Sequence, residues 1–368
     1  MMNKVQFDQI GGDWIDPPIL MPASLPLELS GEAVRSRLIT SADAPGEEVV
    51  LRPDLTLAVA SEFLKSAPDT PVSYRYFGKA FRQPVLPGEP LEFYQTGFEC
   101  FGHEDRAERD LTVLSVICET VAEAGLKDVR LMLGNISIFT DFVKSLQLSS
   151  FWTENLIRAF RRNEGIRRLL TETDIAPRSA LAATLSELPP QRAEELLDEV
   201  LDMSGGQVIA GRTREDILAR LQLRASAADE GPLDSRARRL LGELMGISGS
   251  ADQVLNALRH LAQSSGLKLD DTLDAISAFH NELSARSMPF WKDAQISIQF
   301  GRRFDYYDGL VFELVHNSLN TRRPVAAGGR YDGLIGLLSK GQSSMPAIGG
   351  VVRPDRIAQA QAAEGRMV

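Results

Sequence analysis

Hydrophobic and polar positions alternate along the first part of the chain in stretches that predict strands and helices in turn. Residues 72–81 (VSYRYFGKAF) and 91–102 (LEFYQTGFECFG) alternate well and are rich in aromatic side chains, which is typical of β-strands. The Pro- and Gly-rich residues 83–90 (QPVLPGEP) separate them. The pair is therefore predicted to form an antiparallel hairpin with a long connection.

Three further elements are predicted around this hairpin. Residues 55–67 favour a short helix. Residues 105–124 have the periodicity of a long amphipathic helix, and Gly125 is the residue type that commonly ends one. Residues 129–135 favour another strand.

A block of different character follows, from about residue 149 to residue 286. Its apolar positions recur with helical periodicity and carry almost no strand signal, as in 192–203 (RAEELLDEVLDM), 213–225, 235–247 and 251–266. Charged helix faces of this kind favour a solvated bundle, although a contact with a partner protein remains an alternative.

Strand patterns return after this block, at 295–300, 311–315, 325–329 and 348–352. The predicted fold class is therefore α+β, an antiparallel sheet flanked by helices. We expect one discontinuous core domain (1–148 and 287–368) that carries a helical insertion (149–286), with two independent domains as the alternative.

The composition fits a globular protein with a sizeable core, since 43% of the 368 residues are hydrophobic and 24% are charged. No stretch approaches the roughly 20 apolar residues that cross a bilayer. The N-terminus lacks the basic and apolar segments of a signal peptide. Cys100 and Cys118 offer neither a disulfide framework nor a metal knuckle. We expect a cytoplasmic protein that does not bind a membrane.

The charge balance disfavours tRNA as a partner. Acidic side chains outnumber basic ones by 50 to 40, which gives a formal net charge of −10. Domains that grip a nucleic-acid backbone neutralise phosphates with Lys and Arg, and they are usually basic.

Several kinds of catalytic motif are missing from the sequence. The histidines lack the spacing of a metal site; they are His103, His260, His280 and His316. Neither a G-x-S-x-G nucleophile turn nor a phosphate loop of the G-x-x-x-x-G-K-[ST] kind occurs. No metal and no cofactor is expected.

Polar side chains that could bind a ligand lie within otherwise apolar strand segments. Arg82 follows one arm of the hairpin, and Gln95 and Glu99 lie on one face of the other arm, four residues apart. Similar residues occur in LRPDLT (51–56), RRFDYYDG (302–309) and GGRYDG (328–333). Such groups are costly to bury unless they pair or meet a ligand.

Carboxylates, guanidinium groups and tyrosyl hydroxyls together suit a zwitterionic small molecule. The carboxylates would meet its ammonium group and an arginine its carboxylate. The residue types alone are equally compatible with internal salt bridges on a solvated sheet face.

These segments, in this order, resemble the signatures of the histidyl-tRNA synthetases. LRPDLT is similar to the family's L-R-P-E-x-T, and the hairpin YFGKAFRQP…EFYQTGFECFG resembles class II motif 2. RRFDYYDGLVFE resembles R-G-x-D-Y-Y-x-G-x-V-F-E. AAGGRYDGL resembles the glycine-rich second histidine signature, and PAIGGVVRPDRI resembles motif 3. The resemblance spans both strand-rich regions.

The resemblance implies a class II synthetase-like fold and a histidine pocket. Asp54 and Glu99 would meet the ammonium or imidazole nitrogens, and Arg82 would face the carboxylate. Arg302 matches the family's catalytic arginine, unless it merely pairs with Asp305. The implied histidine-binding set is Asp54, Thr56, Arg82, Gln95, Glu99, Arg302, Tyr306, Tyr307 and Tyr331.

Asp54 departs from the family, which carries Glu at this position. The shorter side chain withdraws the carboxylate by about 1.5 Å, so affinity or selectivity for histidine is expected to change.

Other departures affect the nucleotide half of the site. Where motif 2 continues as F-R-x-E, this chain has Gln83 and Pro84, and the following loop lacks Lys and Arg. Phosphoryl groups need fixed positive charge, so adenylation is predicted to be lost. In motif 3, Arg353-Pro354 replaces a small glycine-containing turn and Asp355 replaces Glu, while Arg356 is kept. An anticodon-binding domain is not expected either.

A histidine pocket with neither an ATP site nor a tRNA-binding domain resembles the regulatory subunits of ATP phosphoribosyltransferase. That resemblance implies a non-catalytic subunit that activates the short catalytic subunit in the first step of histidine biosynthesis. L-Histidine would bind as the effector of feedback inhibition, with residues 83–90 as a candidate lid. The resemblance further implies a homodimer core, with a weak motif 1 at residues 16–20, inside a hetero-octamer.

Two alternatives stay open. The chain could be a truncated histidyl-tRNA synthetase paralogue that still activates histidine with ATP. It could also be a scaffold that does not bind histidine. The surface that would contact a catalytic subunit is not indicated by the sequence.

Overall fold

The computed structural model describes most of the chain outside one long central segment. Described are residues 7–161 and 231–365 except 30–33, 35, 43–47, 67–69, 86–87, 301–305, 320–322, 340, 342 and 344, together with 166, 169–170, 184, 188–189, 191–193, 195–196 and 199. The predicted helix at 213–225 and most of the one at 192–203 lie outside these residues.

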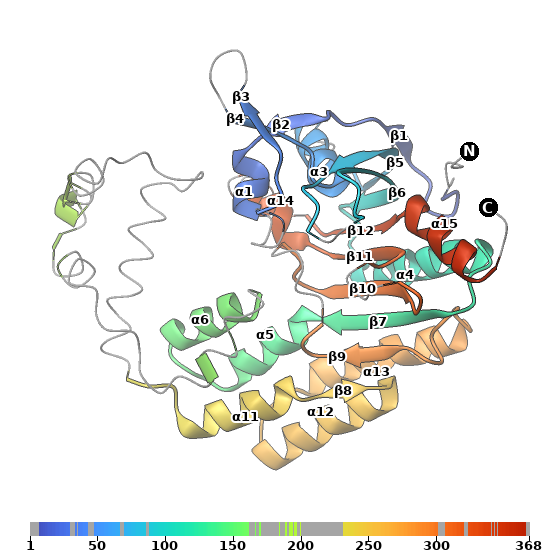
Figure 1. The fold of residues 1–368 in the computed structure, drawn as a ribbon. Helices are drawn as coiled ribbons and strands as arrows, with labels where there is room; N and C mark the ends of the chain where they lie inside the picture. The colour runs from blue at the N-terminus through green and yellow to red at the C-terminus, as the bar shows by residue number, and fades with distance from the viewer. Residues whose placement is uncertain are drawn as a thin grey trace. The chain divides into compact units, whose positions relative to one another are not determined.

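The elements follow one another along the chain as Figure 1 labels them. The strands are β1 (Asp13–Ile15), β2 (Leu20–Pro22), β3 (Thr40–Ala42), β4 (Glu48–Leu51), β5 (Val72–Phe81), β6 (Glu92–Phe101), β7 (Val129–Asn135), β8 (Ser248–Gly249), β9 (Gln295–Ser297), β10 (Leu310–His316), β11 (Ala326–Arg330) and β12 (Ala347–Val352). The helices are α1 (Ser24–Leu29), α3 (Leu55–Ser66), α4 (Arg106–Glu123), α5 (Ile136–Ser145), α6 (Ser150–Arg161), α11 (Ser235–Met245), α12 (Ala251–Ser265), α13 (Asp270–Ala285), α14 (Asp332–Leu338) and α15 (Pro354–Ala363).

A large sheet forms the centre of the fold, with strand order β1-β5-β6-β12-β11-β10-β7-β9-β8. Most neighbouring strands are antiparallel, as predicted, but β1 pairs with β5 and β7 pairs with β9 in parallel. The sheet is therefore mainly antiparallel, as expected, with one parallel pair toward each edge. Parallel neighbours need a long connection between them, and both pairs are separated by helical segments of the chain.

The predicted hairpin is confirmed. β5 and β6 each contain ten residues and pair antiparallel from Val72 opposite Phe101 to Phe81 opposite Glu92. The predicted helices at 55–67 and 105–124 are also confirmed, as α3 and α4. The chain leaves α4 at Gly125, whose φ of 79° is the left-handed conformation that glycine favours.

Helices cover both faces of the sheet. α4 packs against β10, β11 and β12, and Figure 1 shows it running along the sheet. α3 packs against β5 and β6, and α14 packs against α3 and β12. A buried apolar cluster lies on the α3 side and includes Leu57, Phe63, Phe101 and Leu334. A separate small sheet has the strand order β2-β4-β3.

The chain divides into two compact units, one formed by Met1–Asp141 with Leu244–Val368 and the other by Phe142–Glu243. The predicted insertion extends from 149 to 286, whereas α12 and α13 lie in the first of these two units. They belong to the first unit because α12 packs against α13, β8 and β9, and α13 packs against α4. Helical periodicity alone does not show which neighbour a helix packs on.

The strand predicted at 295–300 is shorter than expected. β9 ends at Ser297, because the Ile298 amide bonds to the Ile247 carbonyl and the Phe300 amide turns back to Ser297. None of the helices within the described residues combines the length and the apolar character needed to cross a membrane.

Candidate ligand-binding site

The N-terminus of α3 forms one wall of the candidate site. Asp54 precedes the first helical residue, and its Oδ1 accepts a hydrogen bond from the Leu57 amide at 3.0 Å. Gln95 Oε1, on β6, accepts from the Leu55 amide at 3.1 Å. A carboxylate at this position caps the helix and is favoured by its dipole. The sequence LRPDLT therefore starts a helix and supplies a polar wall at the same time.

Glu99 lies at the centre of the site and is 1% exposed. Its Oε1 accepts hydrogen bonds from the Thr56 hydroxyl at 2.7 Å and from the Tyr76 hydroxyl at 3.1 Å. Its Oε2 accepts a hydrogen bond from the Tyr331 hydroxyl. Three hydroxyls from α3, β5 and the residue after β11 thus converge on one carboxylate.

Burial raises the pKa of Glu99 to about 7. The hydrogen bonds from Tyr331, Thr56 and Tyr76 act in the opposite direction, because they stabilise the carboxylate, and the nearby Asp54 charge adds to the rise. The group therefore titrates near neutral pH and can change its charge when a cationic or hydrogen-bonding ligand arrives.

Asp54 is the second acidic group of the site and is 3% exposed. Burial raises its pKa, whereas the charge of Arg82 and the backbone amides of Leu57 and Thr56 act to lower it. Its Oδ2 is buried and has no hydrogen-bond partner among the described residues. A buried acceptor without a partner is costly, so this oxygen is a natural contact for a ligand donor.

Two glycines make room for this arrangement. A Cβ placed on Gly349, opposite Glu99 in the β12–β6 pair, would lie 1.6 Å from Glu99 Oε2. A Cβ on Gly97, opposite Tyr76, would lie 2.6 Å from the Tyr76 hydroxyl. The glycines of these strands therefore leave the space that the polar side chains occupy.

Three tyrosine rings close another side of the site. The Tyr306 ring lies 4.8 Å from the Tyr307 ring and 5.9 Å from the Tyr331 ring, measured between centroids. Burial holds the pKa of Tyr306 and of Tyr331 well above the ordinary tyrosine value. Both hydroxyls therefore stay protonated and can donate hydrogen bonds.

Arg82 links this site to a cluster of arginines. Its Nε donates to the Pro53 carbonyl at 2.7 Å, and its guanidinium carbon lies 5.4 Å from the centre of the Phe93 ring. A small cavity of about 20 Å³ lies beside it. The lining residues are Arg37, Arg82, Glu89, Pro90, Phe93, Arg323, Arg353 and Arg356.

The positive charge missing from the loop at 83–90 is thus supplied from other parts of the chain. The loop itself contributes Glu89, which pairs with Arg37 at 3.0 Å. The Arg353 guanidinium carbon lies 3.7 Å from the centre of the Phe93 ring and so covers that aromatic face. Burial lowers the pKa of Arg353 to about 10 and that of Arg356 to about 9.

The structure brings together most of the residues that the sequence nominated. Around Glu99 and the start of α3 they are Asp54, Thr56, Gln95, Glu99, Tyr306, Tyr307 and Tyr331, with Arg82 beside Asp54. Arg302 and Asp305 lie outside the described residues, as do Leu86 and Pro87 of the candidate lid.

Tyr76 is the site residue that the sequence reasoning missed. In the hairpin register Tyr76 faces Gly97, and Tyr74 faces Glu99. Tyr76 is therefore a diagonal neighbour of Glu99 on the same sheet face, close enough for a long side chain to reach it. The hairpin register, together with the glycine opposite Tyr76 at position 97, could have identified Tyr76 as a neighbour of Glu99.

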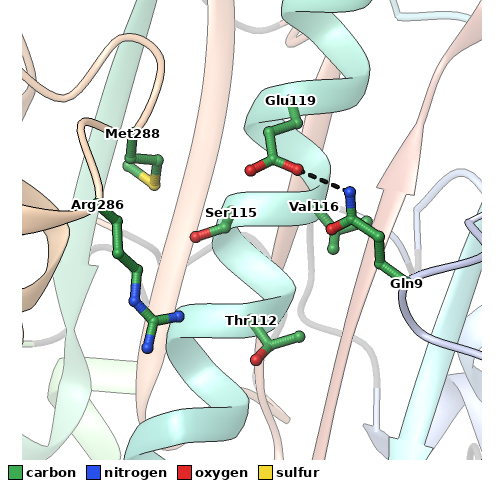
Figure 2. A pocket seen from close by; sticks show the side chains of 7 residues that line it. All are labelled: Gln9, Thr112, Ser115, Val116, Glu119, Arg286 and Met288. Atoms are coloured by element: carbon green, nitrogen blue, oxygen red, sulfur yellow. Dashed lines mark hydrogen bonds between the residues drawn. The ribbon is translucent and has the colours of Figure 1, made fainter.

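A separate hollow of about 370 Å³ lies on the outer side of α4. Figure 2 shows Thr112, Ser115 and Glu119 on the helix facing it, with Gln9 donating to Glu119 at 3.1 Å. Within the described residues, no cluster of His, Cys, Asp and Glu is arranged to hold a metal ion.

Comparisons with known proteins agree with this fold. The family model described as histidyl-tRNA synthetase matches residues 4–221 and 210–357. An ATP phosphoribosyltransferase regulatory subunit from Allorhizobium ampelinum is 31% identical over 359 residues, or 96% of this chain and 94% of that protein. The protein of the same name from Rhizobium rhizogenes is 30% identical over 365 residues, with 95% and 94% covered.

A solved structure shows the same fold. It is that of an ATP phosphoribosyltransferase regulatory subunit/histidyl-tRNA synthetase from Bacillus halodurans, with a TM-score of 0.59 and 22% identity. The match covers 96% of this chain and 75% of that one. The class II synthetase-like fold expected from the ordered motifs is therefore confirmed, and the chain belongs to the family of ATP phosphoribosyltransferase regulatory subunits, which shares its fold with the histidyl-tRNA synthetases.

Proposed function

We propose that this regulatory subunit is non-catalytic and binds L-histidine at the buried polar cluster around Glu99, called the histidine pocket below, so that histidine controls a catalytic ATP phosphoribosyltransferase subunit. The observation that carries the histidine part is the buried Glu99 carboxylate, held by three hydroxyls, with the unpartnered Oδ2 of Asp54 at the start of the same helix. The names of the relatives support the catalytic partner.

The chemistry of the pocket matches the groups of histidine. An imidazole N–H can donate to Glu99, which titrates near neutral pH as imidazole does. The ammonium group can donate to Asp54 Oδ2, and the carboxylate can meet Arg82. The buried tyrosine rings supply an apolar wall for the imidazole face.

Regulation adds a thermodynamic requirement to binding. Histidine shifts the activity of a partner only if it binds two states of the complex with different affinities. We propose that the chain activates a short catalytic subunit when histidine is absent and transmits inhibition when histidine is bound. The assembly would be a cytoplasmic hetero-octamer built on homodimers of this chain and would not contain tRNA.

Thermal unfolding tests histidine binding directly. A ligand that binds only the folded state raises the melting temperature as its concentration passes the Kd. We expect L-histidine to raise the melting temperature of the wild type, and Glu99→Gln to remove the shift. The control is Glu92→Gln on the same strand, because Glu92 is exposed and pairs with Lys79. A wild type that histidine does not stabilise would favour the scaffold alternative.

The arginine cluster favours a second candidate function. Five guanidinium groups around one cavity could hold phosphate oxygens, as an enzyme that activates histidine with ATP would need. Arg353 covers the Phe93 face, which argues against a base stacking there. Histidine-dependent exchange of pyrophosphate into ATP by the purified chain would support this second function over the first.

A further inference from the structure

The end of strand β11 presents consecutive residues to opposite faces of the sheet. Arg330 pairs with Ile348 of β12, in the same alternation as Gly328 with Gly350. A Cβ on Gly350 would lie 2.6 Å from Ile117 of α4, so this is the α4 face. Tyr331 follows directly and places its hydroxyl on Glu99, on the other face. One peptide unit thus joins the α4 side of the sheet to the pocket.

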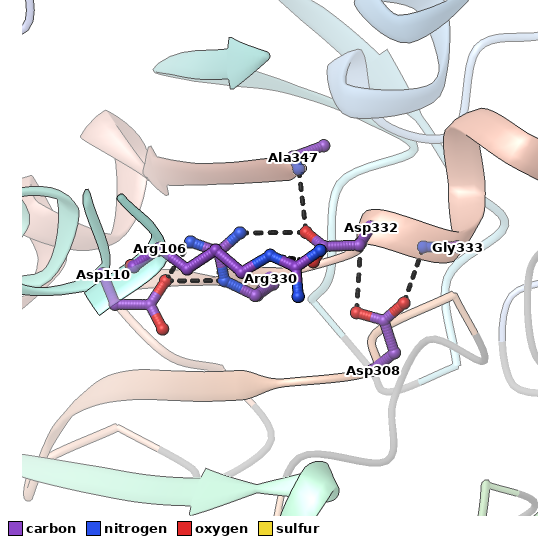
Figure 3. A network of polar contacts seen from close by, with 7 residues as sticks. All are labelled: Arg106, Asp110, Asp308, Arg330, Asp332, Gly333 and Ala347. Carbon is purple, nitrogen blue, oxygen red and sulfur yellow. Dashed lines mark hydrogen bonds and ion pairs between the residues drawn. The ribbon is translucent and has the colours of Figure 1, made fainter. Parts of the chain in front are cut away.

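Arg330 is anchored on the α4 side, as Figure 3 shows, and is 6% exposed. Its Nε donates to Asp110 Oδ1 at 2.8 Å, and a second nitrogen donates to the same oxygen. It also donates to the Arg106 carbonyl at 3.1 Å and to Asp332 Oδ1 at 2.9 Å. A buried guanidinium is tolerated only when its donors are paired in this way, so the side chain is held in one position.

The residues after Tyr331 are fixed as well. Asp332 Oδ1 accepts from the Ala347 amide at 2.8 Å, and the Asp308 carboxylate accepts from the amides of Asp332 and Gly333. The Tyr331 amide itself donates to the Ala347 carbonyl at 2.8 Å. Figure 3 shows the bonds that Asp308 and Asp332 make at the start of α14. Hydrogen bonds from Tyr331 itself and from the residues before and after it therefore fix the backbone at this position.

We propose that the Asp110–Arg330 ion pair is the positioning device of the pocket: it ties α4 to the Tyr331 hydroxyl and makes the affinity for histidine depend on the position of α4. The inference rests on the histidine-binding function proposed above and deepens it by naming how the pocket is regulated. Asp110 and Arg330 touch no ligand in this scheme and act only through Tyr331.

The opposite side of α4 makes contacts at the outer surface of the protein, where a partner could act on the helix. Glu108, two residues before Asp110, pairs outward with Arg286 at 2.7 Å, and Arg286 lines the outer hollow of Figure 2. α4 therefore contacts the pocket through Asp110 and the outer surface through Glu108. A shift of α4 would reach Glu99 through a contiguous set of contacts, the physical route that coupling between sites requires.

The test is a double-mutant cycle measured by calorimetric titration of the full chain with L-histidine. Asp110→Asn keeps the shape but weakens the ion pair, and we expect about tenfold weaker binding, the effect of loosening one charged hydrogen bond. Tyr331→Phe removes only the hydroxyl and should weaken binding by a similar factor. In the Tyr331→Phe background, Asp110→Asn should have no further effect. The matched control is Glu123→Gln, an exposed residue at the far end of the same helix, which should leave the Kd unchanged.

Three outcomes would overturn the inference: additive effects in the cycle, an unchanged Kd in Asp110→Asn with only a lower melting temperature, or an equal loss of affinity in Glu123→Gln. A wild type that does not bind histidine defeats the proposed function, and a ligand-free measurement then decides the inference separately.

The Tyr331 hydrogen bond lowers the pKa of Glu99. Asp110→Asn should therefore raise the pH midpoint of the Glu99 carboxyl carbon signal in NMR, and an unmoved midpoint refutes the coupling.

Discussion

Single residues of the pocket owe their properties to burial more than to ion pairing. Glu99 is surrounded by hydroxyls from Thr56, Tyr76 and Tyr331, and no cationic side chain is bonded to it among the described residues. The alternative of internal salt bridges, which the residue types left open, does not describe this carboxylate. Because hydroxyls offset only part of the cost of burying a charge, its pKa lies near 7.

This pKa predicts how stability depends on pH. The folded-state pKa of Glu99, about 7, lies above the ordinary value of 4.5, so the folded state holds the proton more tightly. The contribution to stability is fully present below pH 4.5 and is lost as the pH rises through 7. We expect the melting temperature of the wild type to fall across this window, and that of Glu99→Gln to fall less.

Two other buried acids act in the same direction, because burial also raises the pKa of Asp54 and raises that of Asp110 to about 6. The comparison between Glu99→Gln and the wild type isolates the Glu99 part. Glu92→Gln serves as the exposed control and should follow the wild-type curve. Parallel curves for Glu99→Gln and the wild type would contradict the raised pKa.

Asp54 caps α3, and substitution can separate this role from the ligand contact proposed for it. Asp54→Asn keeps an oxygen for the Leu57 amide but removes the charge. We expect its unfolding free energy to stay within about 1 kcal/mol of the wild type, and its histidine affinity to fall about tenfold because the ammonium loses a charged partner.

Asp54→Ala removes the cap as well and should cost about 1 kcal/mol of additional stability in chemical denaturation. Equal stabilities of the Asn and Ala variants would show that the cap contributes nothing. The family resemblance pointed to Asp54 as a ligand contact, but its capping role depends on where α3 begins, which only the backbone shows.

At the scale of elements, the central strands are shaped by the side chains that cross between them. Gly349 of β12 lies opposite Glu99 of β6 and leaves the space that the carboxylate fills. The glycines of these strands belong to segments that resemble the family's signatures. Their physical reason is a close approach across the sheet, because antiparallel partners on one face lie side by side.

Substitution at this position should therefore be severe. In Gly349→Ala the new methyl group would overlap Glu99 Oε2, and a central strand cannot shift to relieve it. We expect a loss of about 3 kcal/mol in unfolding free energy, measured by chemical denaturation, and loss of histidine binding.

The control for this substitution is Gly242→Ala in α11, where an added Cβ meets open space. It should be neutral or stabilising by up to about 1 kcal/mol, since Ala is the better helix former. Comparable destabilisation by the two substitutions would argue against a specific clash at Glu99.

At the scale of the whole molecule, the division of the chain did not follow the change in sequence pattern. α12 and α13 have the same amphipathic sequence pattern as the preceding helices, but they belong to the unit that contains the large sheet. Helical periodicity shows that a face is buried and does not show what buries it. The boundaries proposed for a helical insertion therefore needed the tertiary contacts.

The proposed role of the chain makes a prediction about assembly. Co-expression with a short catalytic subunit should give one particle with the mass of eight chains, measured by light scattering or native mass spectrometry. Catalytic turnover should need this chain, and histidine should inhibit the complex but not a Glu99→Gln complex. Separate elution of the two proteins, or inhibition that survives Glu99→Gln, would contradict the proposal.

The sequence by itself determined the main elements and named most residues of the candidate site. Alternation in 72–81 and 91–102 specified the hairpin, since a strand must bury every second side chain, and the ordered motifs named Thr56, Gln95 and Glu99 in advance. These are local signals, carried by neighbours in the chain.

Only the tertiary structure decided which of these groups meet. Tyr76 reaches Glu99 through the hairpin register, and the arginines beside Phe93 come from separate segments of the chain. Arg330 and Tyr331, neighbours in sequence, serve opposite faces of the sheet. Contacts of this kind depend on strand register, on strand order and on how segments far apart in the sequence pack together. A local pattern of residues contains none of this information.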